Sequence, residues 1–165
     1  MGPAPAILGT LSLTAAVELI CLVHLLVCVG FVATVSSVES VNIAGVEISP
    51  LAQCMTTAWF VVGIPAIIHA GIGTVYRVES HLAVYLWYLT GTAAVAITWI
   101  VVFMKYGNAC ATLQPVPGSS HTAASFVCGI SNGMIVFWML LVLGAVSTAL
   151  YLVWSMKEYI RSKVE

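Results

Sequence analysis

The chain has 165 residues, of which 61% are hydrophobic and only 7% are charged, with a formal net charge of −1 at pH 7. A soluble domain would carry about a quarter charged residues, so the composition excludes a globule surrounded by water. The near-neutral charge points to neither nucleic acid nor anionic lipid as a partner. All six carboxylates come from Glu, which leaves little material for paired-carboxylate catalysis.

Four long apolar stretches fill most of the chain, and each reaches the roughly 20 residues that a helix needs to cross a bilayer. Short connections between consecutive helices favour antiparallel neighbours. The sequence therefore predicts an all-α integral membrane protein, a four-transmembrane-helix up-down bundle with short loops, forming a single domain over residues 1–165 in contact with membrane lipids. The predicted helices cover about 7–35, 51–76, 82–104 and 126–156.

Ionisable residues inside the first two predicted helices are the strongest candidates for a site. Glu18 and His69 are predicted to be buried polar residues, because ionisable groups at membrane depth normally face a partner. At 1.5 Å per residue they lie at similar depth on adjacent antiparallel helices, which favours a hydrogen bond between them. We expect no cofactor on this interpretation.

A cofactor site is the alternative interpretation of the same helices. His69 and His24 could serve as axial ligands of haem b or chlorophyll, because a neutral imidazole binds iron or magnesium well. The two histidines differ in depth by about 14 Å, so a shared haem would require a considerable helix tilt.

The first outer loop, residues 36–50, nearly alternates apolar and polar side chains around Ala44 and Gly45. This pattern predicts a small β-hairpin. Two strands are marginally stable alone, so the hairpin would need support from a neighbouring segment.

Small residues mark faces where helices could approach closely. Ala66, Ala70 and Gly73 share one face of the second helix, and Gly129 and Gly133 form a GxxxG spacing at the start of the fourth. Such faces allow close helix packing, within the chain or against another protein.

Cys110 and Cys128 lie in or beside the second outer loop. In an oxidising compartment a disulfide between them would close a loop of about 17 residues, worth about 3 kcal/mol in the chain-entropy model. Two free thiols are the alternative.

The distribution of basic residues predicts which side of the membrane the two termini face. Arg77 lies between the second and third helices, and Lys157, Arg161 and Lys163 follow the fourth, whereas Lys105 lies at the opposite face. The positive-inside rule therefore places both termini on the cytosolic, matrix or stromal side. An aromatic belt is predicted at this same face, and Tyr85, Trp87 and Tyr88 are among its members.

No CxxC pair, phosphate-binding loop or nucleophile–base set is evident in the sequence. We therefore expect a non-catalytic small integral membrane subunit that packs into and stabilises a larger assembly. Its expected partners are other integral membrane subunits, in a hetero-complex rather than a homo-oligomer. An accessory subunit of a respiratory or photosynthetic complex, in a mitochondrial inner or thylakoid membrane rather than a plasma membrane, is the leading expectation.

Two alternatives remain open. One is the haem- or pigment-binding redox anchor that would use His69 and His24. The other is a claudin-like tetraspan adhesion or paracellular protein whose outer loops are stiffened by Cys110–Cys128, although the first outer loop has no Trp or Cys.

Overall fold

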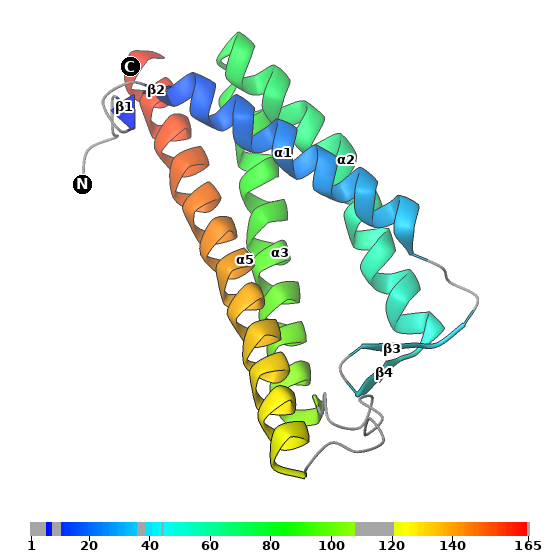
Figure 1. Ribbon diagram of the computed structural model, residues 1–165. Coiled ribbons are helices and arrows are strands. Elements are labelled where there is room, and N and C mark those ends of the chain that lie inside the picture. The colour runs from blue at the N-terminus through cyan, green and yellow to red at the C-terminus, as the bar shows by residue number, and fades with distance from the viewer. Residues whose placement is uncertain (1–5, 8–10, 36–38, 44, 108–120, 165) are drawn as a thin grey trace.

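The computed structural model describes residues 6–7, 11–35, 39–43, 45–107 and 121–164, and for 6, 7, 11, 121–129, 131, 132 and 164 it describes the backbone alone. This part of the chain is mostly helical, with four long helices packed together and a small β-hairpin (Figure 1). The helices are α1 (Leu13–Thr34), α2 (Pro50–Tyr76), α3 (Glu79–Tyr106) and α5 (His121–Val164).

Each helix contains a segment long and apolar enough to cross a membrane. The shortest has 22 residues, about 33 Å at 1.5 Å per residue, which matches a hydrocarbon core of about 30 Å. The fold is therefore compatible with an integral membrane protein. The four segments are Leu13–Thr34, Pro50–Tyr76, Glu79–Tyr106 and Gly133–Lys163.

The first helix begins later than the predicted start near residue 7. The Ser12 hydroxyl caps it by accepting a hydrogen bond of 3.2 Å from the Ala15 amide. The preceding residues instead form the short antiparallel strands β1 (Ala6–Ile7) and β2 (Leu11–Ser12). Hydrophobicity continues through this segment, so composition alone could not reveal the cap.

Helices α2 and α3 begin and end within three residues of the prediction. In α2, Pro50 occupies the first turn and the Ser49 hydroxyl accepts from the Ala52 amide at 3.3 Å. The last helix is longer at both ends than the predicted 126–156.

The predicted hairpin is confirmed. Strands β3 (Val41–Ile43) and β4 (Val46–Ile48) pair in antiparallel fashion. Gly45 in the turn has a φ of 80°, which a residue without Cβ adopts without strain. Support comes from α2, because the Gln53 side-chain amide donates to the carbonyl oxygens of Glu39 and Ile48, at 2.8 and 3.1 Å.

A tight turn joins α2 to α3. The amides of Arg77 and Val78 both donate to the Gly73 carbonyl, and Arg77 adopts the left-handed conformation at φ 57°. A Cβ on Gly73 would lie only 2.6 Å from the Cβ of His81, so the turn requires glycine there.

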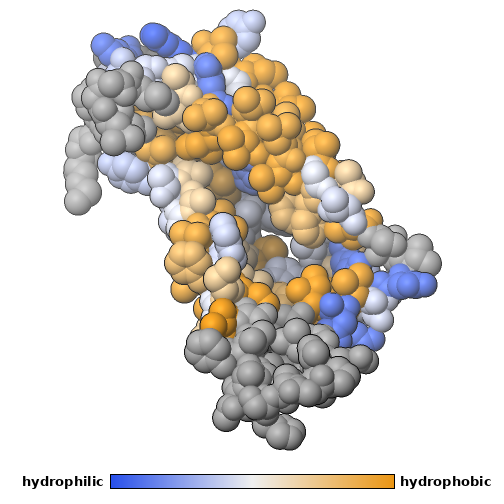
Figure 2. Space-filling view, viewed as in Figure 1, coloured by the Kyte–Doolittle hydropathy of each residue, from blue (hydrophilic) through white to orange (hydrophobic). Residues whose placement is uncertain are grey.

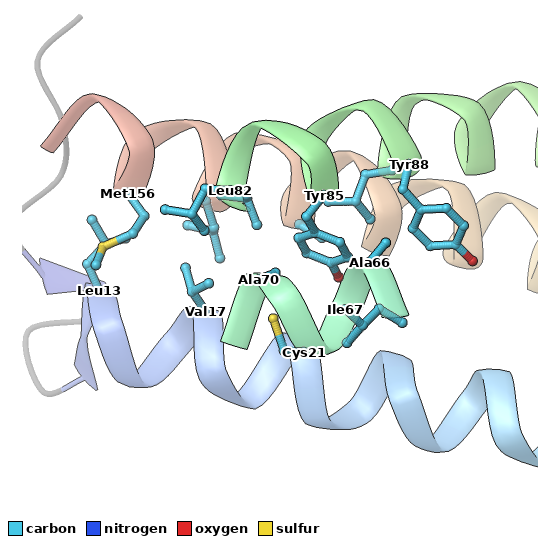
Figure 3. Packing of buried hydrophobic residues seen from close by; sticks show 14 of the residues in the cluster. Leu13, Val17, Cys21, Ala66, Ile67, Ala70, Leu82, Tyr85, Tyr88 and Met156 are labelled. Carbon is cyan, nitrogen blue, oxygen red and sulfur yellow. The ribbon is translucent and has the colours of Figure 1, made fainter. Parts of the chain in front are cut away.

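The buried core lies toward the end of the molecule where α1 begins and α5 finishes (Figures 1 and 3). Helix α1 packs along α2, and α3 packs along α5. All four helices contribute side chains that are at most 5% exposed. They include Leu13 and Val17 from α1, Ile67 and Ala70 from α2, Leu82, Tyr85 and Leu89 from α3, and Val153, Met156 and Ile160 from α5.

The predicted packing residues fall into two groups. Ala66, Ala70 and Gly73 are buried in α2. Gly133 is exposed, with open space where a Cβ would lie, so none of the other described helices packs against it. The surroundings of Gly129 lie outside the described residues.

The predicted disulfide also lies outside the described residues. Residue Cys110 is not among them, and only the backbone of Cys128 is. The bridge therefore stays a prediction, while the described Cys21, Cys28 and Cys54 are free thiols.

Candidate functional site

A polar and aromatic cluster lies where α1, α2 and α3 meet. Nδ1 of His24, on α1, lies 2.8 Å from the hydroxyl oxygen of Tyr85, on α3. The His24 ring also stacks on Tyr88, with ring centroids 5.6 Å apart. Figure 3 shows both tyrosines pointing from α3 into the bundle. The positions of His24 and its two tyrosines therefore depend on one another.

Further side chains complete this cluster. The Cys28 sulfur lies 3.8 Å from the Tyr88 hydroxyl oxygen. On the other side, the Trp59 ring stacks on Tyr88 with centroids 5.4 Å apart. The Trp59 indole N–H donates to the Thr92 hydroxyl at 3.1 Å, which ties α2 to α3.

Two glycines leave the space that the aromatic rings occupy. A Cβ on Gly63 would overlap the Tyr88 hydroxyl, and a Cβ on Gly91 would overlap the Trp59 ring. Both rings are therefore accommodated by the absence of a side chain on the facing helix. The small residues at these positions make room for aromatic side chains, in addition to allowing the helices to pack closely.

His69 lies apart from this cluster. Its ring makes an edge contact with His81 of α3, with centroids 5.2 Å apart. Nδ1 of His81 is buried and has no hydrogen-bond partner among the described residues. No ring contact joins His69 to His24 in this part of the chain, and their role as axial haem ligands stays a prediction.

The structure corrects the expected buried pair of Glu18 and His69. Both side chains are exposed, and no hydrogen bond or ion pair joins Glu18 to another described residue. The physical reason is helical phase, because Val17 and Cys21 point into the core and place Glu18 at the side of α1. Similar position along two neighbouring helices does not fix the direction in which the side chains point.

The contacts that the cluster makes are hydrogen bonds and ring stacking. Nδ1 of His24 is occupied by Tyr85, and Nε2 has no partner among the described residues. No set of three or more His, Cys, Asp or Glu side chains that could hold a metal occurs within the described ranges. The geometry fits a cross-link between three helices.

The prediction that Tyr85 and Tyr88 belong to an interfacial aromatic belt is wrong. Their side chains are only 0% and 5% exposed. Trp87 is 78% exposed, in agreement with a position on the surface. The available signal was the spacing of three residues between Tyr85 and Tyr88, which puts both on one face of α3 while Trp87 points elsewhere.

Comparison with known proteins gives no match for this chain among protein family models, curated proteins or solved structures.

Proposed function

We propose that this protein is a non-catalytic integral membrane subunit that packs into, and stabilises, a larger membrane protein assembly. The observation that supports this most strongly is the outward-facing carboxylate of Glu18 in the most apolar of the four candidate spans. Its surroundings are apolar, since the neighbouring Leu19 and Leu22 are 53% and 55% exposed.

Glu18 carries a free-energy cost within a membrane unless another group covers it. It lies about 7.5 Å along the axis from Leu13, the first residue of α1. A carboxylate facing acyl chains costs about 2.5–3.5 kcal/mol at the helix centre even on the lenient insertion scales, and less toward the interface. A hydrogen-bond donor or cation from another subunit would remove that cost. The position of Glu18 is therefore easier to explain in an assembly than in a lone chain.

Helix surface that the other described helices leave uncovered also supports the proposal of an assembly. Over residues 130–148 of α5, none of the described side chains is buried. Met134, Phe137 and Trp138 on this stretch are 53%, 56% and 60% exposed. Figure 2 shows a broad hydrophobic surface on the α1 side as well. These faces are suited to lipid and to the helices of other subunits.

The partner is expected to be a different protein. A two-fold homodimer through this face of α1 would bring two Glu18 carboxylates together, and like charges in a low-dielectric medium repel strongly. We place the assembly in an energy-transducing membrane of the mitochondrial inner or thylakoid type, where small accessory subunits are common. Both termini are proposed to face the matrix, stroma or cytosol, on the strength of Arg77, Lys157 and their neighbours.

Native gel electrophoresis in mild detergent tests the proposal. The wild-type chain should migrate in a species larger than a monomer. Glu18→Gln should preserve that species because an amide keeps a hydrogen bond, whereas Glu18→Leu should weaken it by about 1 kcal/mol, roughly fivefold. Glu47→Gln in the hairpin is the matched control and should have no effect. Migration of the wild type as a lone monomer under every gentle condition would contradict the proposal.

A further inference from the structure

A groove on the outer surface of α3 lies beside the last part of α5. Its lining comes from one face of α3 and from a single lysine of α5, and this open groove has a volume of about 360 Å³. The α3 residues follow the helical spacing i, i+3, i+4, i+7, so they form a continuous strip along the helix. The lining residues are Ala83, Leu86, Trp87, Thr90 and Lys157.

The groove has one charged end and an apolar body. Nζ of Lys157 lies 3.5 Å from Oε1 of Glu79, the first residue of α3, which places the lysine at the end of the groove nearest the helix terminus. From Ala83 the lining continues along α3 for about 10 Å, to Thr90. The Thr90 hydroxyl already donates to the Leu86 carbonyl at 2.9 Å, so it does not require a polar ligand.

Trp87 adds a second feature of a membrane interface. Its side chain is 78% exposed, more than any other large hydrophobic residue among those described. Indole rings favour the boundary between headgroups and acyl chains, which is the level that Lys157 indicates for this end of the groove. The groove thus offers a cation at one end for a phosphate, and an apolar strip flanked by an exposed indole for an acyl chain.

We propose that this groove binds a lipid with an anionic phosphate headgroup, with the phosphate at Lys157 and an acyl chain along Ala83, Leu86 and Thr90. Basic side chains between helices at the membrane surface recognise such headgroups. The net charge of the whole chain gave no indication of this site, because recognition depends on the local charge. The inference does not depend on the proposed function, since a lone chain could bind lipid in the same way.

Glu79 determines how strongly Lys157 can bind phosphate. The Lys157 and Glu79 side chains are 26% and 41% exposed, and ion pairs with this degree of exposure are weak. A phosphate group can therefore share or replace the carboxylate. Removing the Glu79 charge should strengthen lipid binding, a gain that general loss of structure could not produce.

Native mass spectrometry of the full chain tests the site. The protein would be released from detergent with phosphatidylglycerol or with phosphatidylcholine of identical acyl chains. The wild type should retain phosphatidylglycerol more than phosphatidylcholine, by less than the about fivefold ratio that one unpaired basic side chain supplies, because Glu79 partly neutralises Lys157. Lys157→Gln should abolish this preference, and Glu79→Gln should increase it. Lys163→Gln, which removes a lysine positioned over Tyr159 rather than in the groove, should leave it unchanged.

Two further experiments test separately the contributions of the acyl chain and of the phosphate group. Ala83→Trp should fill the groove and reduce retention of both lipids, while excess inorganic phosphate should not displace bound phosphatidylglycerol. Displacement by phosphate would mean that the site binds only a free anion. Equal retention of the two lipids by the wild type, or no gain from Glu79→Gln, would overturn the proposal even if Lys157→Gln failed to fold.

Discussion

Both halves of α5 carry large hydrophobic side chains, but the two halves pack very differently. Along α5, Val153, Met156 and Ile160 are at most 3% exposed, whereas Phe137 and Leu141 on the same helix are 56% and 47% exposed. The first group meets α1 and α3 in the core at the end where α5 finishes, and the second lies on the half of α5 that extends toward the hairpin end (Figure 1). Hydrophobicity therefore sets which residues leave water, while helix arrangement sets which of them meet protein.

The difference in packing between the two halves of α5 indicates which interactions stabilise the bundle. Between helices already in lipid, transfer of apolar surface from water contributes little, so close packing and hydrogen bonds must hold the bundle together. Such contacts are concentrated at the packed end and around His24. Substitutions at the packed end should therefore be costly, and equivalent substitutions on the exposed half of α5 should not.

The largest effect is expected from a cavity in the core. Leu89→Ala removes a side chain that is 1% exposed, and we expect it to lower the free energy of unfolding by about 2 kcal/mol, the low end of the range for such cavities because the transfer contribution is small. Leu141→Ala, at a 47% exposed position, should change it by less than about 0.5 kcal/mol. Unfolding by denaturing detergent in mixed micelles measures both. Equal losses would remove the distinction between the two ends.

A second pair of variants adds volume instead of removing it. Gly63→Ala places a methyl group against the Tyr88 hydroxyl and should cost about 1 kcal/mol or more through overpacking. Gly144→Ala meets open space and should be neutral or slightly stabilising, because alanine favours helix more than glycine does. The same unfolding measurement applies, and a neutral Gly63→Ala would show that the tyrosine relaxes freely.

The smallest effect concerns one hydrogen bond. Tyr85→Phe keeps the ring but removes the hydroxyl that bonds to His24, and should cost about 0.6 kcal/mol, the mean for polar contacts between membrane helices. Tyr151→Phe, at a 46% exposed position, is the control. A loss above about 2 kcal/mol would mean that the cluster acts cooperatively rather than as a single contact.

Length and hydrophobicity were sufficient to predict four long helices, and the alternation around Gly45 was sufficient to predict the hairpin. The rotation of each helix about its own axis was less predictable. In a helix that is apolar on every side, the sequence does not distinguish the face that points into the bundle from the face that points outward. The sequence therefore predicts an interfacial Tyr85 and a buried Glu18, whereas Tyr85 is buried and Glu18 is exposed. Distinguishing them required knowing which helix packs on which.

The most direct test of the assembly is site-specific photo-crosslinking in native membranes. A photoreactive residue at Leu22, exposed one turn after Glu18, should form a crosslink to the transmembrane segment of another protein. The same residue at Val27, exposed on a different side of α1, provides the comparison. Crosslinking of Leu22 to a different protein, reduced by Glu18→Leu and retained in Glu18→Gln, is the result that the account predicts. Adducts with lipid alone at Leu22 would contradict it.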